Sequence, residues 1–293
     1  MKRKAISRKW SAQTYNSMFY EKTGYLTEDY KYFHINDTSD RTYEFHYHDF
    51  YKVIFFISGD VTYNVEGKSY ELKPMDIVLV GRNEIHCPIV SSKKAYERIV
   101  IYLSDIFLSE KISDSFELTD CFKKASKDHV NVLRFSQKES TRLFDTLKRL
   151  ETYKDSDSFG FDAYMRLNVL EFLVRLNEYS AKNVITYDGR AVYNEKILKV
   201  IDHINNNLKD DLSIEALSEC SGLSRFHLMK VFKEYTGYTI HRYVTEKRLN
   251  LVSTLSDGKM KIKDACVEAG FADYATYLRA KKNYKNTVRS FEE

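Results

Sequence analysis

The sequence predicts an α+β protein of two domains, an N-terminal antiparallel β-barrel with a helical hairpin and a C-terminal domain built only of helices. The chain of 293 residues exceeds what one compact core usually holds, which favours two domains. Short segments rich in aromatic and β-branched residues fill residues 30–105 and are separated by turn-forming residues. Beyond residue 105, apolar residues recur at intervals of three and four, the period of an amphipathic helix.

Turn signals bound the short segments of the β-rich part, for example Ser58-Gly59-Asp60 and Glu66-Gly67-Lys68. Short strands at such regular spacing are typical of a small antiparallel barrel or sandwich. The expected strands are Tyr43–Tyr47, Tyr51–Ile57, Val61–Val65, Ser69–Leu72, Ile77–Val80 and Glu97–Leu103.

Two amphipathic stripes follow the β-rich part. Leu143, Leu147 and Leu150 form the first stripe, and a longer set of apolar residues at helical spacing forms the second. A helical hairpin of this kind covers the barrel, pairs with a second subunit, or does both, and the sequence leaves these alternatives open. The second stripe consists of Phe161, Met165, Val169, Phe172, Leu173 and Leu176.

We expect the linker between the domains in residues 181–194, which show no clear period and contain the turn pair Asp188-Gly189. Residues 1–180 then form the barrel with its hairpin, and residues 195–293 form the helical domain.

The composition argues against several classes of protein. Apolar runs such as Val53–Ile57 fall far short of the roughly 18 residues of a membrane span, which excludes a membrane protein. No apolar stretch follows the basic start of the chain, which argues against a secretory signal. The cysteines include no C-x-x-C pair, which argues against a disulfide framework or structural zinc site and suits a reducing cytosol. They are Cys87, Cys121, Cys220 and Cys266.

The net charge of +4 is unevenly distributed along the chain. Residues 1–189 hold 28 Lys and Arg against 28 Asp and Glu, whereas residues 190–293 hold 18 against 14. A basic C-terminal part indicates a module that binds a polyanion, because contacts to phosphates supply most non-specific affinity for nucleic acid. A solvated surface with spare lysines is the alternative interpretation.

Residues 211–232 have the pattern of two short helices joined by a glycine turn. Ser213 is expected to cap the first helix and Ser224 the second, and Gly222 supplies the turn. This is the pattern of a helix–turn–helix unit, whose second helix is able to enter a major groove of DNA. The expected buried residues are Ala216, Leu217 and Cys220 on the first helix, Leu223 in the turn, and Leu228, Val231 and Phe232 on the second helix.

The same pattern recurs about 50 residues later in the chain. Gly270-Phe271 forms the second turn, Asp273 caps the following helix, and a segment with helical spacing, Tyr243–Val252, connects the two units. Two such units suit successive major grooves on one face of DNA, about 34 Å apart. The first helix of the second unit contains Ile262, Ala265 and Cys266, and its second helix contains Tyr277 and Leu278.

At these positions the chain resembles the AraC/XylS family of bacterial transcription regulators over residues 195–291. The matching positions are Leu223-Ser224, Leu228 through Phe232-Lys233, Thr236-Gly237, Arg248-Leu249, Ile262, Ala265, Gly270-Phe271-Ala272-Asp273 and Arg279.

The resemblance implies that the second helix of each unit reads DNA. Carried over by position, the base-facing residues would be Arg225, Phe226, Met229 and Lys230 in the first unit and Tyr274, Ala275, Leu278 and Arg279 in the second. Lys230 and Arg279 point away from the apolar stripes and are able to donate to guanine or phosphate. The alternatives are solvated surface cations and, for Phe226, packing beneath the turn.

The end of the second unit departs from the family pattern. Ala280 runs directly into Lys281-Lys282 where an aromatic residue is usual, and Lys285 and Val288 stand where Gly and Pro are usual. A shift of one residue rotates a helix by about 100°, so we expect the end of the second reading helix to be displaced or weakly packed.

Residues 40–103 resemble the cupin barrel that serves as a sensor domain in this same family. His46 and His48 are two positions apart, so on a strand both side chains lie on the same face. His86 lies after the turn Pro74-Met75-Asp76, as in the second of the two sequence motifs of cupins. Metal-binding cupins place a Glu where Lys52 stands here, and a cation repels a metal ion, so we expect no metal and no cofactor. The expected effector-binding residues are His46, His48, Lys52, His86 and Arg98.

These residues would hydrogen-bond a small polar effector such as a sugar or sugar acid. The alternative is that the histidines are scaffold residues bonded to the backbone. On the leading hypothesis the chain is a cytoplasmic, nucleoid-associated regulator, an activator on family grounds, and not an enzyme. Its partners would be double-stranded DNA, the effector, RNA polymerase and a second copy bound through helices in residues 140–180. A metal-dependent cupin enzyme with a helical appendage, or a sensor that has lost DNA binding, are the rival hypotheses.

Overall fold

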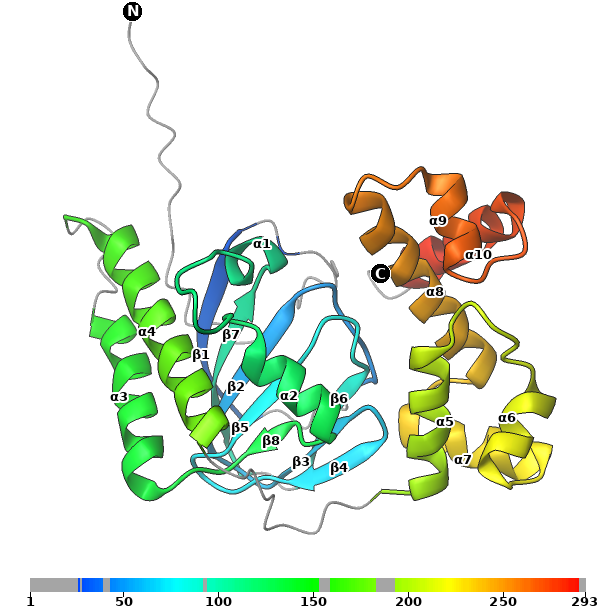
Figure 1. Cartoon of the computed structure of the whole chain (residues 1–293). Coiled ribbons are helices and arrows are strands. Elements are labelled where there is room, and N and C mark those ends of the chain that lie inside the picture. Colours follow the sequence, from blue (N-terminus) through cyan, green and yellow to red (C-terminus); the bar gives the residue numbers. More distant parts are fainter. Residues whose placement is uncertain are drawn as a thin grey trace, which may run out of the picture.

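The computed structural model in Figure 1 describes residues 26, 28–38, 43–91, 94–152, 159–182 and 193–289, without the side chains of residues 152, 257 and 284–289. The prediction of two domains in the α+β class is confirmed, with antiparallel sheets first in the chain and helices last. Most of the expected linker lies outside the described residues, so its position stays a prediction.

The N-terminal domain contains two antiparallel sheets that face each other. The larger sheet has the strand order β1-β7-β2-β5-β8 and the smaller has the order β4-β3-β6. The strands are β1 (Tyr30–Asp37), β2 (Tyr51–Ser58), β3 (Val61–Val65), β4 (Lys68–Glu71), β5 (Ile77–Val80), β6 (His86–Val90), β7 (Tyr96–Leu103) and β8 (Val132–Leu133).

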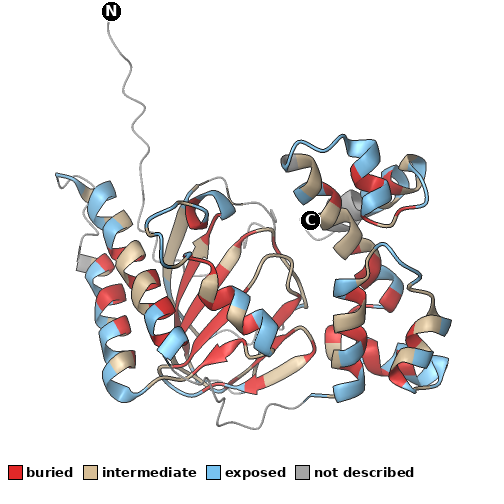
Figure 2. Ribbon diagram, in the orientation of Figure 1, coloured by how far each residue is buried: buried red, intermediate tan, exposed pale blue. Residues whose placement is uncertain are grey.

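Strand β2 shows why the larger sheet forms the centre of the domain. Val53 and Phe55 belong to the core beneath the helices, whereas Ile54 and Phe56 belong to the core between the two sheets. Successive side chains of a strand point to opposite faces, so an uninterrupted apolar segment is stable only when both faces are covered. Figure 2 shows the resulting buried layer across the sheets.

The expected strand Tyr43–Tyr47 is wrong. Only His46 pairs in this segment, through one bridge to His86, while Phe45 and Tyr47 pack against the core of the helical domain. Strands β1, β6 and β8 were not among the expected strands. β6 contains Pro88, which has no N–H to donate, and it is tolerated because β6 lies at the edge of its sheet.

Helices α1 (Asp105–Leu108), α2 (Asp120–Asp128), α3 (Gln137–Thr152) and α4 (Phe161–Lys182) complete the N-terminal domain. The hairpin of α3 and α4 lies along the larger sheet, on the opposite side from the helical domain (Figure 1). The first predicted stripe and most of the second are buried there, including Leu147 and Phe172. Phe161 and Met165 of the second stripe are half-buried. The hairpin therefore covers the barrel, as one of the sequence alternatives proposed.

The helical domain contains two hydrophobic cores joined by one helix. The first core surrounds Tyr243 and Val244 at the start of α8, and the second contains Val252 near its end. No helix in the described part of the chain is apolar and long enough to cross a membrane. The helices are α5 (Glu195–Asn206), α6 (Ile214–Ser221), α7 (Arg225–Thr236), α8 (Ile240–Asp257), α9 (Ile262–Glu268) and α10 (Tyr274–Arg289).

Candidate functional site

Helices α6 and α7 form the first predicted helix–turn–helix unit. The side chain of Ser213 accepts a hydrogen bond from the amide of Ala216 at 3.3 Å, which confirms the predicted cap. Gly222 ends α6 with a φ of +63°, a left-handed conformation that favours glycine. Ser224 occupies the cap position of α7, but its side chain makes no capping bond there.

Burial in the first unit follows the expected pattern on α7 but not on α6 or in the turn, where Leu223 is half-buried rather than buried. Leu228, Val231 and Phe232 are buried on α7 as predicted. On α6 the fully buried residues are Leu217 and Ser221, whereas Ala216 and Cys220 are half-buried.

Helices α9 and α10 form the second predicted helix–turn–helix unit. Gly270 has a φ of +91°, and a Cβ there would overlap the carbonyl oxygen of Leu208. Only glycine fits this position. Asp273 accepts a hydrogen bond from the amide of Thr276 at 2.6 Å, which confirms the predicted cap and lowers the pKa of the carboxyl group.

The backbone of α10 continues as a helix to Arg289, through the segment that departs from the family pattern. Ala280 packs against the second core, and Lys281 donates to the hydroxyl of Tyr277 at 3.1 Å. The side chains of Lys285 and Val288 lie outside the described residues.

Most of the predicted base-facing residues lie on exposed surfaces of α7 and α10. Arg225 forms an ion pair with Glu215 at 2.7 Å, and Arg279 donates to the hydroxyl of Thr276 at 3.1 Å. Tyr274 differs, because it is half-buried and its ring lies 5.8 Å from that of Tyr277. The exposed members of the set are Arg225, Phe226, Met229, Lys230, Ala275, Leu278 and Arg279. Their contact with DNA stays a prediction.

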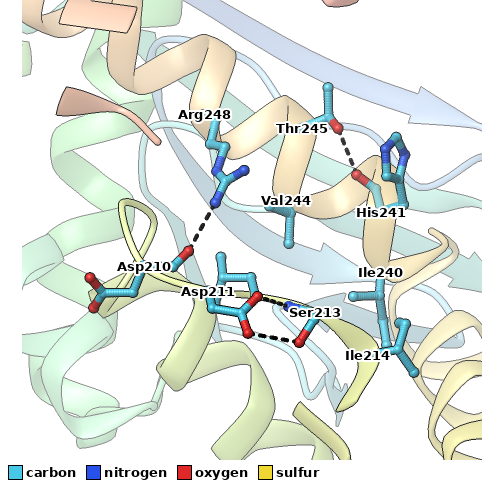
Figure 3. Close-up of a pocket in the computed structure, with 10 residues that line it drawn as sticks. Asp210, Asp211, Ser213, Ile214, Ile240, His241, Val244, Thr245 and Arg248 are labelled. Carbon is cyan, nitrogen blue, oxygen red and sulfur yellow. Dashed lines mark hydrogen bonds between the residues drawn. The ribbon is translucent and has the colours of Figure 1, made fainter. Parts of the chain in front are cut away.

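Arg248, one of the residues that match the family pattern, holds a loop of the helical domain in place. Its guanidinium donates to the backbone carbonyls of Leu208 at 2.8 Å and Asp210 at 3.2 Å, which ties the loop between α5 and α6 to α8. Burial lowers the pKa of Arg248. The side chain borders a groove of about 460 Å³ between α8 and the start of α6, where Ser213 bonds to Asp211 (Figure 3).

The structure brings His46, His48 and His86 together in the N-terminal domain. The ring of His86 lies 4.3 Å from that of His46 and 4.8 Å from that of His48. In each ring Nδ1 lies 2.7–2.9 Å from a backbone carbonyl oxygen. A carbonyl only accepts, so each Nδ1 carries the hydrogen and Nε2 of the neutral ring is an acceptor. Burial lowers the pKa of His48 and His86 well below its usual range, which keeps both rings neutral.

Lys52 completes this cluster from strand β2. Its Nζ lies 3.4 Å from Nε2 of His86, and burial together with the nearby Arg98 lowers the pKa of Lys52 to about 7. No group of three or more His, Cys, Asp or Glu in the described ranges could hold a metal ion. We refer to His46, His48, His86 and Lys52 as the imidazole cluster.

Arg98 makes its contacts with residues outside the imidazole cluster. Its guanidinium pairs with Asp37 at 3.2 Å, donates to the carbonyl of Tyr96 at 2.8 Å, and lies 3.9 Å from the centre of the Tyr96 ring. Its charge still lowers the pKa of Lys52. A direct role of Arg98 in effector binding stays a prediction.

The N-terminal and helical domains contact each other beside the imidazole cluster, which the sequence did not indicate. Phe45, next to His46, packs on Gly237, whose φ is +73° and whose Cβ, if present, would overlap the Phe45 ring. The hydroxyl of Tyr238 donates to the carbonyl of Phe45 at 3.1 Å. A residue larger than glycine at position 237 would separate the two surfaces.

Glu66 makes the polar centre of this interface. Its carboxylate accepts from Nζ of Lys247 at 2.9 Å, from the amide of Ile85 at 2.7 Å and from the hydroxyl of Tyr243. Lys247 also donates to the carbonyl of Asn83 at 2.8 Å. The segment from Asn83 to Ile85 therefore contacts α8, and it leads directly into His86 of the imidazole cluster.

Glu84 lies in the same segment and is half-buried beside Glu66. Burial, followed by the repulsion of Glu66, raises the pKa of Glu84 to about 7. The amides of Gly81 and Asn131 donate to its carboxylate at 2.7 and 3.1 Å. No pattern in the sequence predicted these contacts, because Glu66 and Lys247 lie 181 positions apart.

Comparisons with known proteins match both domains. The family described as an AraC-like ligand binding domain matches residues 31–149, and the family described as a helix-turn-helix domain matches residues 217–288. The multiple antibiotic resistance protein MarA of Escherichia coli is 33% identical over 89 residues, which are 30% of this chain and 70% of MarA.

Two further similarities span both domains. The uncharacterized HTH-type transcriptional regulator YbfI of Bacillus subtilis is 22% identical over 244 residues, 78% of each chain. A solved structure of ToxT from Vibrio cholerae covers 86% of this chain and 93% of its own at 16% identity, with a TM-score of 0.34.

We expect Lys52→Met to remove a pH dependence of stability. The pKa of Lys52 is about 7 in the folded chain against an ordinary value of 10.5, so between these values the unfolded chain binds more protons at this position. The free energy of unfolding of the wild type therefore rises with pH relative to the variant, by up to about 1.4 kcal/mol per pH unit. Urea unfolding across this window measures the difference, with Lys138→Met, an exposed lysine on α3, as control. If the free energies of unfolding of the wild type and of Lys52→Met differed by the same amount at every pH in this window, the expectation would be contradicted.

We expect Lys247→Met to weaken the contact between the domains. The change leaves the largely buried carboxylate of Glu66 without its cation and destabilises the chain by about 2 kcal/mol. A double-mutant cycle with Glu66→Gln should return a coupling energy of about 1–3 kcal/mol in urea unfolding. Lys199→Met, an exposed lysine on α5, serves as control. Additive effects of the two substitutions would show that the pair is not coupled.

Proposed function

The chain belongs to the AraC/XylS family of transcriptional regulators, and on that premise we propose that it binds specific duplex DNA through α7 and α10 in response to a small polar effector held at the imidazole cluster. The observation that supports this proposal most strongly is the repeated helix–turn–helix unit. In each copy the second helix, α7 or α10, has one face exposed to solvent. A ligand-binding domain precedes these units in the chain.

Charge supports the DNA-binding half of the proposal. Lys230 and Arg279 are exposed on the two reading helices, opposite the residues that pack into the two cores. Cations on the exposed face of a helix in the major groove donate to phosphates or to guanine. The excess of positive charge in residues 190–293 acts in the same direction.

The imidazole cluster supports a polyhydroxylated effector. The Nε2 atoms of its three histidines are acceptors that suit the hydroxyl groups of a sugar, and Nε2 of His48 has no hydrogen-bond partner among the described residues. Lys52 supplies a donor which, when protonated, suits the carboxylate of a sugar acid. We therefore favour a sugar or sugar acid as the effector.

The contact between the domains supplies a route from effector to DNA. His46 follows Phe45, which packs on Gly237 at the end of α7, and His86 follows the segment that bonds to Lys247 on α8. An effector that shifts either histidine changes the surface that α7 and α8 contact. Binding of effector and of DNA are then coupled through this interface.

Dimer formation, activation and recruitment of RNA polymerase complete the proposal. The outer face of α4 exposes Tyr164 and Leu167, which supports pairing with a second copy through the hairpin. Sedimentation of a Leu167→Glu variant tests this contact.

Transcription in vitro with RNA polymerase, with and without effector, tests the direction of control. A regulator of this kind acts in the cytoplasm, at the nucleoid.

We expect Lys230→Ala and Arg279→Ala to weaken DNA binding in a salt-dependent manner. Removal of one phosphate contact reduces the slope of log affinity against log salt by about 1. Fluorescence anisotropy with a labelled duplex over a range of salt concentrations measures the slope. Lys138→Ala and Arg142→Ala, exposed cations on α3, are matched controls and should not change it. Absent or salt-insensitive binding by the wild type would contradict the proposed function.

We expect sugars or sugar acids to raise the melting temperature of the wild type, because a ligand held only by the folded chain stabilises it. A thermal-shift screen of aldoses and the corresponding uronic acids measures the effect. His86→Phe should lose the response to every hit, and Lys52→Met should lose the response to the acids, whereas Lys138→Met should respond as the wild type does. A shift that survives His86→Phe would place the ligand elsewhere.

A further inference from the structure

The side chain of Lys52 lies on the face of strand β2 that is turned toward the smaller sheet. Ile54 and Phe56, two and four positions further along β2, belong to the core between the two sheets. Side chains two positions apart on a strand point to the same face, so Lys52 points between the sheets as well. Lys52 is 9% exposed, although lysines are almost never buried unless they are paired.

The amine of Lys52 has no carboxylate partner in the described part of the chain. Its Nζ lies 3.4 Å from Nε2 of His86 and 5.9 Å from the centre of the Tyr102 ring. An ammonium group at this place has lost its hydration without gaining a counter-ion, and burial together with Arg98 lowers its pKa to about 7. The titratable and charged groups around Nζ are His48, His86, Cys87, Arg98 and Tyr102.

These surroundings make Lys52 a nucleophile. Lysine amines become nucleophilic when they are desolvated or lie near another cation, and both conditions hold here. We infer that Lys52 forms a reversible imine with the aldehyde group of an open-chain aldose, which the neighbouring imidazoles hold by its hydroxyl groups. The inference rests on the proposed function, since it adds a covalent contact to the effector in the same site.

The step needs only the aldehyde and groups of the imidazole cluster. The lone pair of Nζ adds to the aldehyde carbon, and one amine proton moves to the aldehyde oxygen to give a carbinolamine. The second amine proton moves to the hydroxyl group, which leaves as water while the C=N bond forms. Nε2 of His86 is an acceptor at 3.4 Å and is placed to carry these protons. Nothing is oxidised or reduced, and the uncharged imine removes the cost of a buried ammonium group.

The arrangement of the histidines favours a hydroxyaldehyde of small size. His46 is half-buried, whereas His48, His86 and Lys52 are buried, so the cluster extends from near the surface inward. The rings of His46 and His86 are 4.3 Å apart, so a ligand that passes His46 next meets His86 and Nζ of Lys52. Nε2 of His48 has no partner among the described residues and suits the hydroxyl group beside the aldehyde.

The test traps the imine with sodium borohydride, whose hydride reduces the C=N bond to a stable secondary amine. The full-length wild type is mixed briefly at pH 7 with glycolaldehyde, the shortest hydroxyaldehyde, then reduced, digested and analysed by mass spectrometry. Each trapped lysine carries a hydroxyethyl group. The neutral fraction of Lys52 at pH 7 exceeds that of an ordinary lysine about a thousandfold. Its lower basicity offsets part of this advantage, so labelling of Lys52 should exceed that of any exposed lysine by about tenfold or more.

Controls within and beside the wild type connect the label to Lys52. Lys138 and Lys199 are exposed lysines that report ordinary reactivity in the same molecules. Labelling of Lys52 should level off above about pH 8, whereas that of Lys138 and Lys199 should rise about tenfold per pH unit. Glycolaldehyde should raise the melting temperature of the wild type and of Lys138→Met but not that of Lys52→Met. Urea unfolding of Lys52→Met, which adds no charge to the core, verifies that this variant folds.

The outcomes separate the imine from the proposed function. Labelling of Lys52 no stronger than that of Lys138 would overturn the imine and leave the proposed function intact, because hydrogen bonds alone could hold the effector. Labelling of Lys52 that rises with pH as that of Lys138 does would also overturn the imine. Selective labelling of Lys52 in a chain that binds no duplex DNA in a salt-sensitive manner would support the imine and overturn the proposed function.

Discussion

The geometry of the helical domain depends on one helix, α8, which is buried in two separate hydrophobic cores. Tyr243 and Val244 pack among α5 and α7, and Val252 packs among α9 and α10. A continuous helix of 18 residues transmits its orientation from one core to the other, because its backbone hydrogen bonds resist bending. The rotation and spacing of the two reading helices are set by the residues of α8 that enter each core.

The same helix also connects the reading helices to the N-terminal domain. Lys247 bonds to Glu66 and to the segment before His86, and Arg248, one position further, holds the loop between α5 and α6. Neighbouring side chains on a helix diverge by about 100°, so two adjacent cations serve two different surfaces. Any change at the imidazole cluster that displaces Glu66 or Asn83 therefore acts on the element that both helix–turn–helix units share.

Burial gives the imidazole cluster its chemical character. Backbone carbonyls hold each Nδ1, and burial keeps His48 and His86 neutral, so the rings offer acceptors rather than positive charge. Lys52 among them has a pKa of about 7, because burial and the nearby Arg98 disfavour its charged form. The cations of α7 and α10 differ, because Lys230 and Arg279 remain exposed to solvent.

Local chemistry allowed much of this protein to be predicted from its sequence. The caps at Ser213 and Asp273 and the turns at Gly222 and Gly270 depend on neighbouring backbone groups, and the structure confirms each one. Features that depend on distant partners were decided only by the tertiary structure. Phe45 and Tyr47 have the composition of a strand but pack against the helical domain. The pairing of Glu66 with Lys247 joins residues whose sequence neighbours carry no sign of each other, because a long-range contact is set by how complete domains pack.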